Sequence, residues 1–459
     1  MPGSSRRKFL QQLGSSGLAL SAGSFMAFNE NDEIILPEQK IAGPNDKLRI
    51  ATIGMGIMGY NDTDAALKVP GIELVAACDL YTGRLQRAKE KYGNTLAVTK
   101  DYREILERKD IDAVIVATGD HWHARIATDA MNKGKHVYCE KPMVHRISEG
   151  LPLIATQQKT KKIMQIGSQG ISSSVYKKAR ELYLAGEIGK LNCIEASYDR
   201  HSALGAWQYT MPNDISTQTV DWDRYIAGMT KEPFDAKKFF WWRNYKAFGT
   251  GVAGDLFVHL LTKIHMITGS KGPSKIYATG ETAYWKDGRD VPDVMTAILD
   301  YPETTEHPAF QLTLRVNFCS GSGDTSSTKL IGDEGVMELK NGLTVSHDIL
   351  PKAPGIGGWD ALDTYPKAMQ ESLVNAYNQK YSKQDQQSLV KPSVTYKAPD
   401  AEDEHVLHFA NFFNAIRTNG SVYEDAIFGF RAAAPCLACN DSYFEKKIIG
   451  WDADNMKLI

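Results

Sequence analysis

The sequence predicts an α/β protein of two domains, the first of which is a Rossmann domain. A chain of 459 residues exceeds what one hydrophobic core usually supports, so two folded domains are expected. Near the start of the first domain, an apolar strand leads directly into a glycine-rich loop. Further apolar strands then alternate with helical segments, which is the pattern of a parallel sheet flanked by helices.

The glycine-rich loop follows residues 47–53 and precedes a helical pattern that ends at Pro70. In this setting Gly54 permits a tight turn, Gly56 lets the backbone approach a pyrophosphate, and Gly59 lets the helix pack closely on the strand. The free N–H groups at the start of the helix favour a phosphate. We therefore predict that this loop binds a dinucleotide through Gly54, Gly56, Ile57, Met58 and Gly59.

An acidic residue at the end of the second strand indicates which dinucleotide is bound. Residues 73–78 form this strand and Asp79 follows it, twenty residues beyond Gly59. A carboxylate at this position accepts both ribose hydroxyls and repels a 2′-phosphate, so NAD is the expected cofactor. Arg84 lies close enough in sequence to keep NADP as the alternative.

The alternation of helices and strands continues to about residue 168. Helical patterns cover residues 84–92 and 102–109, and a strongly apolar strand covers residues 112–118. The strand at residues 136–139 then delivers Glu140-Lys141-Pro142 at its carboxyl end. Ligands bind at the carboxyl ends of strands in open α/β sheets, so this tripeptide is a candidate site element.

Composition and charge favour a small-molecule partner. The formal net charge is −2 and the basic residues are scattered, so no nucleic-acid-binding surface is expected. The six cysteines lie apart except for Cys436 and Cys439 in an alanine-rich helical stretch, where buried thiols are the simple interpretation and a redox pair the alternative. His121 and His123 have no nearby third ligand, so no metal site is expected.

The N-terminus carries Ser5-Arg6-Arg7-Lys8-Phe9-Leu10 and a mildly apolar run from Leu13 to Phe28. This pattern predicts a twin-arginine export signal at residues 1–30, a polar linker at 31–46, and a periplasmic protein without a stable membrane anchor after processing. The alternative is a chance basic pair before a helix, and no clean Ala-x-Ala cleavage site is present. Because this route carries folded proteins, a tightly held dinucleotide would suit it.

An ordered set of motifs resembles the Gfo/Idh/MocA family, the relatives of glucose-fructose oxidoreductase and inositol dehydrogenase. Besides the glycine loop and Asp79, the motifs are Ala117-Thr118-Gly119-Asp120-His121-Trp122-His123, Glu140-Lys141-Pro142, Gly167-Ser168-Gln169 and Gly254-Asp255-Leu256-Phe257-Val258-His259. Gly119 stands where the family often has proline.

The resemblance implies an NAD-binding Rossmann domain at 47–168 and a substrate-binding and oligomerisation domain at 169–459. This second domain is expected to be an α/β domain with an open, mostly antiparallel sheet, and the protein to be a homo-oligomer. Strand-like patterns at 276–282, 295–301 and 310–318, and a helical one at 405–417, agree with that expectation.

Three residues are the candidates for catalysis. Lys141 lies near the expected nicotinamide, and a helix over 253–268 would place Asp255 and His259 on one face. By resemblance, His259 is a second acid/base group, and Asp255 lies near the substrate hydroxyls or orients the imidazole. The further cofactor contacts implied are Thr118, Trp122, His123, Glu140, Lys141 and Gln169.

The substrate is expected to be a carbohydrate. Aromatic residues concentrate between 200 and 245, and aromatic faces pair well with sugar C–H surfaces, although most of these rings are expected in the core. Arg200 and His201 are weaker candidates for the same wall of the pocket. The predicted substrate-binding residues are Tyr198, Trp242, Arg243, Asp255 and His259.

The resemblance implies an NAD-dependent oxidoreductase that oxidises a ring hydroxyl of a sugar, glycoside or cyclitol with tightly bound NAD. An NAD-dependent glycosidase that works by oxidation, elimination and reduction is the alternative on the same fold. Relatives with that chemistry carry valine at the position of Lys141, so the intact Glu140-Lys141-Pro142 favours simple oxidoreduction. A nucleotide-binding protein without catalysis is the third possibility, since fold alone does not fix function.

Overall fold

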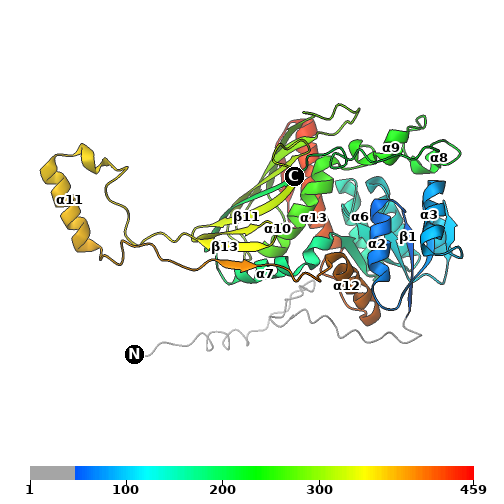
Figure 1. Cartoon of the computed structure of the whole chain (residues 1–459), viewed down its shortest axis with the longest axis horizontal. Helices are drawn as coiled ribbons and strands as arrows, with labels where there is room; N and C mark the ends of the chain where they lie inside the picture. The colour runs from blue at the N-terminus through cyan, green and yellow to red at the C-terminus, as the bar shows by residue number, and fades with distance from the viewer. Residues whose placement is uncertain (1–46) are drawn as a thin grey trace. The chain divides into compact units, whose positions relative to one another are not determined.

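The computed structural model describes residues 47–459, and the predicted export signal and linker lie outside this range. The first sheet is parallel and has six strands in the order β3-β2-β1-β4-β5-β6, which is the strand order of the Rossmann fold (Figure 1). Its strands are β1 (Leu48–Ile53), β2 (Ile72–Cys78), β3 (Ala97–Thr99), β4 (Ala113–Val116), β5 (His136–Glu140) and β6 (Met164–Gly167).

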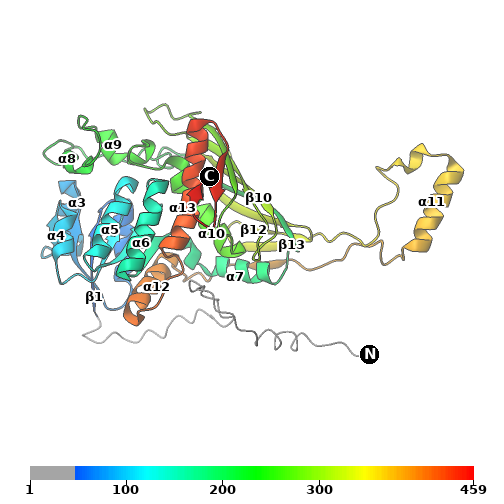
Figure 2. The same cartoon turned by 180° about the vertical axis from the view of Figure 1, so that it is seen from behind.

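Helices cover both faces of this sheet, so its central strands are apolar along their whole length. All four residues of β4 are buried, as expected for a strand covered on both faces. Figure 1 shows α2 and α3 towards the viewer, and Figure 2 shows α4, α5 and α6 from behind. The helices are α2 (Ile57–Leu67), α3 (Thr82–Tyr92), α4 (Tyr102–Glu107), α5 (His123–Asn132) and α6 (Gly150–Thr160).

A helix from the end of the chain completes the core of the Rossmann domain. Phe409, Phe412 and Phe413 of α12 (Glu404–Thr418) are buried in one cluster with apolar side chains of β1, β4 and β5. The Phe409 ring stacks on Tyr138 of β5 with centroids 4.1 Å apart. The two predicted domains therefore share one continuous packing, and the last helices return to the first sheet.

The second sheet has ten strands and is antiparallel except where β7 and β10 run parallel. Buried and exposed side chains alternate along its strands. In β9, Ala297 and Leu299 are buried, whereas Ile298 between them is exposed. This finding confirms the predicted fold class, a Rossmann domain joined to an open, mostly antiparallel sheet. Its strands are β7 (Leu191–Asp199), β8 (Lys275–Glu281), β9 (Val294–Tyr301), β10 (Phe310–Asn317), β11 (Thr325–Gly332), β12 (Gly335–Leu339), β13 (Leu343–His347), β14 (Val394–Tyr396), β15 (Ile449–Asp452) and β16 (Lys457–Leu458).

Three helices of the second domain form a group in which α10 packs against both of the others. They are α7 (Ser174–Leu184), α10 (Val258–Thr268) and α13 (Ala426–Glu445), and α13 also contacts β8 and α6. Within residues 47–459, none of the helices is long and apolar enough to cross a membrane.

Residues 200–252, which we call the cap segment, link β7 to the helices and pack on the Rossmann domain. Tyr81, just after β2, forms a β-bridge with Val220 and donates a hydrogen bond from its hydroxyl to Asp214 at 2.5 Å. The backbone N–H of Thr82 donates to Thr219 at 2.9 Å. These contacts hold the cap segment over the carboxyl ends of the parallel strands. It carries the short helices α8 (Trp222–Tyr225) and α9 (Ala236–Phe240).

The connection between β13 and β14 forms an arm, residues 348–393, that stands away from the sheet in both views (Figures 1 and 2). Its base continues the strand pairing through a bridge between Ile349 and Leu389. Its helix α11 (Lys367–Lys380) has no buried residue. Since helices gain most of their stability from packing an apolar face, α11 lacks the contacts that such a helix normally has.

Candidate active site

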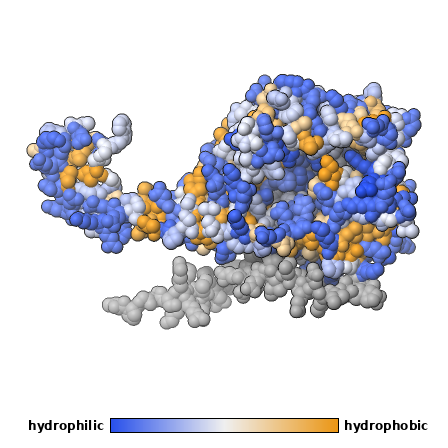
Figure 3. Space-filling model, in the orientation of Figure 1, coloured by the Kyte–Doolittle hydropathy of each residue, from blue (hydrophilic) through white to orange (hydrophobic). Residues whose placement is uncertain are grey.

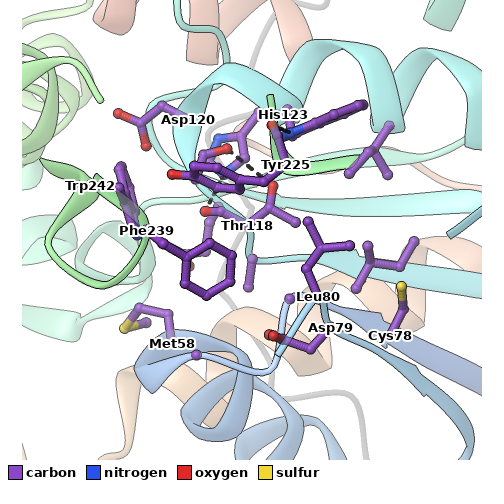
Figure 4. A pocket seen from close by; sticks show the side chains of 18 of the residues that line it. Met58, Cys78, Asp79, Leu80, Thr118, Asp120, His123, Tyr225, Phe239 and Trp242 are labelled. Atoms are coloured by element: carbon purple, nitrogen blue, oxygen red, sulfur yellow. Dashed lines mark hydrogen bonds between the residues drawn. The ribbon is translucent and has the colours of Figure 1, made fainter. Parts of the chain in front are cut away.

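A cleft lies between the carboxyl ends of the Rossmann strands and the cap segment. It is open to solvent and runs from the glycine loop and Asp79 to Lys141 and Arg243. In Figure 4, Met58 and Asp79 line one side of this cleft, while Phe239, Tyr225 and Trp242 approach from the cap segment. The sequence predicts that the cofactor binds at the carboxyl ends of the parallel strands, and the cleft lies at these ends.

The glycine loop has the geometry that its spacing predicts. Gly54 has a φ of +94°, and a Cβ atom there would lie 2.5 Å from the carbonyl oxygen of Ala117. A Cβ on Gly59 would lie 1.8 Å from the oxygen of Gly54, so this glycine allows the helix to pack on the loop. A Cβ on Gly56 would meet nothing closer than Arg84 at 4.0 Å, which leaves room for a ligand.

The start of α2 offers free N–H groups to the cleft. Its first turn, which includes Ile57 and Met58, has no acidic residue and no side-chain cap. Unpaired N–H groups at a helix start bind anions, so the pyrophosphate of a dinucleotide fits here.

Asp79 is held in place at the end of β2. One carboxylate oxygen accepts the backbone N–H of Met55 at 2.8 Å, and the other accepts that of Tyr81 at 2.8 Å. Arg84 lies 3.5 Å from the same carboxylate and over the ring of Phe240, 5.4 Å from its centroid. A fixed carboxylate at this point of the cleft fits the adenosine ribose of NAD.

The loop after β4 forms the next wall of the cleft. Thr118, Trp122 and His123 all line it, as the sequence predicts. The indole N–H of Trp122 donates to the backbone oxygen of Tyr225 at 2.9 Å, which ties the loop to the cap segment. His123 is fully buried and bridges the backbone oxygens of Thr118, at 3.3 Å, and Pro142, at 2.8 Å. His123 therefore joins this loop to the Glu-Lys-Pro turn.

Buried acids lie beneath the Glu-Lys-Pro turn. Gln169 donates from Nε2 to Glu140 at 2.5 Å and to the hydroxyl of Tyr138 at 2.8 Å. Burial raises the pKa of Glu140 to about 7, although the charge of Lys141 opposes the effect. Burial, followed by the nearby Glu140, raises the pKa of Asp62 well above its ordinary value. Glu140 and Gln169 thus belong to a network of neutral or nearly neutral groups behind the cleft.

Lys141, Asp255 and Arg243 meet at one carboxylate. The ammonium of Lys141 donates to Asp255 Oδ1 at 2.8 Å and to its backbone oxygen at 3.1 Å. Arg243 donates from Nε to the same Oδ1 at 3.2 Å, and its guanidinium lies 4.2 Å from the ring centroid of Trp242. Burial would raise the pKa of Asp255, but the two cations hold it well below its ordinary value. Asp255 is therefore an anion that fixes both cations.

A π-helical turn carries Asp255 into this position. The sequence predicts a helix over 253–268, and the structure is helical throughout this range, although its first turn is not an α-helix. Ala253–Phe257 form a π-helical turn, η5, and only Val258–Thr268 form the α-helix α10. Apolar spacing does not distinguish the two, because both are buried and helical. Such turns are rare and concentrate at functional sites.

His259 lies at the start of α10, beside the ring of Tyr198 at a centroid distance of 6.3 Å. Burial lowers the pKa of His259 well below its ordinary value, and the charges of Lys141 and Lys263 act in the same direction. Its imidazole is therefore neutral and able to accept a proton. The part of the chain that the structure describes holds no group of three or more His, Cys, Asp or Glu side chains placed to bind a metal ion.

Comparison with known families supports this site. Residues 48–168 match the family described as "Oxidoreductase family, NAD-binding Rossmann fold". Residues 219–338 match the family described as "GFO/IDH/MocA C-terminal domain". The chain belongs to the Gfo/Idh/MocA oxidoreductase family. The family match confirms that the first domain is an NAD-binding Rossmann domain.

The curated relatives of this Gfo/Idh/MocA protein include enzymes of two kinds. Inositol 2-dehydrogenase of Salmonella typhimurium is 30% identical over 170 residues, which are 37% of this chain and 50% of that protein. Glycosyl hydrolase family 109 protein 1 of Akkermansia muciniphila is 30% identical over 232 residues, which are 42% of this chain and 48% of that protein. The chain thus spans about half the length of the curated relatives that it matches.

Solved structures of similar fold cover nearly the whole of the described chain. Levoglucosan dehydrogenase in complex with NADH and levoglucosan aligns with a TM-score of 0.62 and 17% identity, over 88% of this chain and 99% of that one. Aldose-aldose oxidoreductase from Caulobacter crescentus, complexed with glycerol, aligns with a TM-score of 0.62 and 16% identity over the same shares. At these identities the similarity concerns the fold.

Sequence reasoning missed several residues of the site. Tyr225, Phe239 and Phe240 of the cap segment line the cleft, whereas Trp207 and Trp222 from the same aromatic stretch are buried in the core. The density of aromatic residues was visible in the sequence, but the direction of each ring was not. Asp62 was also missed, because it lies in a helix whose other buried residues are small.

A change at Asp79 is expected to alter nucleotide selectivity. Asp79→Ser removes the ribose acceptor and frees Arg84 to meet a 2′-phosphate, so NAD should bind about 10-fold to 100-fold more weakly and NADP more tightly. Titration of nucleotide-free protein with each cofactor measures this. Asp110→Ser, on a distant loop, is the control. Unchanged affinities in the Asp79 variant would contradict the assignment.

The raised pKa of buried Glu140 is expected to make the stability of the protein depend on pH. Its folded-state pKa of about 7 exceeds the ordinary value of 4.5. The contribution of this side chain to folding stability is therefore complete below pH 4.5 and is lost as the pH rises through about 7. The Glu140→Gln side chain stays neutral at every pH. As the pH rises across that window, the free energy of unfolding of this variant should increase relative to that of the wild type by on the order of 2 kcal/mol. Melting temperatures at pH 5 and pH 8 measure this, with the exposed Glu107→Gln as control. A Tm difference that does not change with pH would refute it.

Proposed function

We propose that this protein oxidises a ring hydroxyl of a sugar, glycoside or cyclitol and transfers the hydride to tightly bound NAD. The observation that carries the proposal is the ion pair of Lys141 with Asp255 beside the NAD cleft, with the neutral imidazole of His259 one helical turn beyond Asp255. Relatives named inositol 2-dehydrogenase, and a similar fold named levoglucosan dehydrogenase, support this substrate class.

Each residue of the site has a part in the reaction. NAD, which the glycine loop and Asp79 would hold, would supply the hydride acceptor. Lys141 donates a hydrogen bond to the hydroxyl oxygen and stabilises negative charge there, and His259 takes the hydroxyl proton on its neutral imidazole. Asp255, fixed by Arg243, holds the ammonium of Lys141 in place. The protein thus supplies placement and proton transfer.

The cap segment supports the proposal that NAD stays bound between turnovers. It is joined to the Rossmann domain by the Tyr81–Val220 bridge and by the hydrogen bond from Trp122 to Tyr225. Release of the cofactor would require these contacts to open. A second substrate would then reoxidise the nucleotide inside the site.

Hydride transfer from a labelled carbohydrate tests the proposal. Purified protein with its own nucleotide is mixed with sugars and cyclitols that carry deuterium on one ring carbon. We expect deuterium at C4 of the bound nicotinamide after a single turnover. Turnover of a substrate without any such transfer would defeat the proposal.

The glycosidase remains the second candidate because curated relatives include glycosyl hydrolase family 109 proteins at 30% and 32% identity. The same residues would oxidise the sugar; elimination of the aglycone, addition of water to the resulting double bond and reduction of the ketone would follow. Release of a reducing sugar from an aryl glycoside, with no net change in NADH, would support the glycosidase function. Lys141, in place of the valine expected for that chemistry, favours simple oxidoreduction.

We also propose that the protein is a homo-oligomer, and the arm supports this. The arm exposes large apolar side chains that a soluble monomer normally covers, and Figure 3 shows apolar patches on it. They are Leu350, Trp359, Tyr365, Met369, Leu373, Leu389 and Val390. A second copy of this chain, which brings its own arm and open sheet, would cover them by a self-complementary contact.

Removal of the arm is expected to dissociate the oligomer. The bridge between Ile349 and Leu389 marks where a short turn fits, so residues 350–388 are replaced by Asn-Gly. The shortened protein should sediment as a monomer with a folded active site, measured by analytical ultracentrifugation and by retention of NAD. A monomeric full-length protein, or an unchanged assembly after shortening, would contradict the role of the arm.

Finally, we propose export to the periplasm through the twin-arginine route. The signal lies at residues 1–30, outside the described part of the chain. Replacement of Arg6 and Arg7 by lysine should keep the protein in the cytoplasm in a fractionation experiment. Export of this variant at the normal level would refute the signal.

A further inference from the structure

We propose that the ring substrate carries an anionic group, a carboxylate or a phosphate, which Arg200 and Lys263 bind. This inference rests on the proposed function and narrows its substrate class from carbohydrates in general to acidic ones.

The two cations stand next to the predicted substrate residues. Arg200 follows Tyr198 by two residues at the end of β7, and its guanidinium lies 5.3 Å from the centroid of the Tyr198 ring. Lys263 follows His259 by one turn of α10, and its ammonium lies 4.7 Å from the centroid of the Tyr176 ring. Both are thus oriented by aromatic faces beside the catalytic imidazole.

Neither cation has a carboxylate partner among residues 47–459. Arg200 donates to the backbone oxygen of Gly205 at 2.9 Å, and Lys263 packs against Gly170, where an added Cβ would lie 3.1 Å from its ammonium. Lys263 also hydrogen-bonds Tyr176, and the charge of Glu404 on α12 acts on it, but no ion pair forms with either. Partly buried cations normally have an anionic partner, and neither Arg200 nor Lys263 forms an ion pair in the described part of the chain.

Around His259, three cations act together with one carboxylate, Asp255. Asp255 already pairs with both Lys141 and Arg243, so it cannot neutralise the other two cations as well. The charges of Lys141, Lys263 and Arg200 all act on the imidazole of His259, which places them around one point. The nicotinamide of NAD⁺ would add a further positive charge. Oriented cations around a partly enclosed site favour an anionic ligand over a neutral one.

Matched sugars that differ in one group test this inference. The holoenzyme is supplied with methyl glycosides, the corresponding methyl glycuronides and the sugar 6-phosphates, in the gluco, galacto and manno series. Reduction of bound NAD gives kcat/KM for each, and calorimetry gives affinity without turnover. We expect at least one acidic sugar to exceed its neutral partner about 10-fold to 100-fold in both measurements. The carboxylate and phosphate series show which anion is preferred.

Variants connect the preference to the two cations. Arg200→Gln and Lys263→Gln should each lower the acidic-to-neutral ratio about 10-fold, whereas Lys340→Gln at an exposed turn should leave it unchanged. Neutral sugars that bind and react as well as acidic ones would overturn the inference and leave the proposed function standing. Failure of every sugar to reduce NAD would instead defeat the proposed function, and calorimetry would still decide the anion preference.

Discussion

Replacement of Lys141 by methionine is expected to lower kcat about 10³-fold while the nucleotide stays bound. The ammonium lies 2.8 Å from Asp255, and we propose that it holds the reacting hydroxyl oxygen. Methionine keeps the length and apolar stem of lysine, and Arg243 still neutralises Asp255, so the fold should persist. The loss of acid/base and electrostatic assistance accounts for the size of the effect. Single-turnover reduction of the bound nucleotide, followed by absorbance, measures it.

A second lysine provides the control for this variant. Lys133 at the end of α5 forms an exposed ion pair with Glu107, and Lys133→Met should leave kcat unchanged. A Lys141 variant that turns over within a few-fold of the wild type would remove lysine from the mechanism. If variants of both Lys141 and His259 kept their activity with NAD bound, a role limited to nucleotide binding would gain support.

The cofactor half of the site could be predicted from the sequence because its determinants are local. Gly54, Gly56 and Gly59 are required by the turn itself, and Asp79 follows within one strand. The strand order of the first sheet agrees with that prediction. Short-range constraints of this kind depend on few other parts of the chain, so spacing alone carries them.

The prediction of the candidate catalytic residues depended on resemblance, because the residues that meet there are distant in the sequence. Lys141 and Asp255 are 114 residues apart, and no periodicity brings them together. Resemblance to known motifs named both residues, and the structure adds the contact between them. The π-helical turn at Ala253–Phe257 could not be predicted, since an apolar helical stretch has the same composition in either form.

Long-range packing was also beyond the sequence. The return of α12 to the Rossmann sheet requires Phe409 to meet Tyr138, although these residues lie far apart in the chain. The inward direction of Phe240 depends on the contact of its ring with Tyr81, whose centroid lies 5.4 Å away. Aromatic residues predict burial well, but burial against the core and burial against a cofactor have the same pattern.

The next largest effect is expected for His259→Asn, which should lower kcat about 10²-fold to 10³-fold. Asparagine retains hydrogen-bonding capacity but cannot take up a proton, so substrate affinity should change less than kcat. Binding of an inactive deoxy analogue, measured by calorimetry, separates the two. His405→Asn, at a partly exposed position on α12, is the matched control.

The pH profile provides the stricter test of this histidine. Burial lowers the pKa of His259 well below 6.5, so the folded protein keeps a neutral imidazole where an exposed histidine would already be protonated. The wild-type rate of the chemical step should therefore stay level as pH falls from 8 through 6.5, and decline only at lower pH. The sign follows because protonation removes the base, and a lowered pKa moves that loss towards acid. A wild-type rate that halves near pH 6.5, with no such inflection in His259→Asn, would show an exposed imidazole instead.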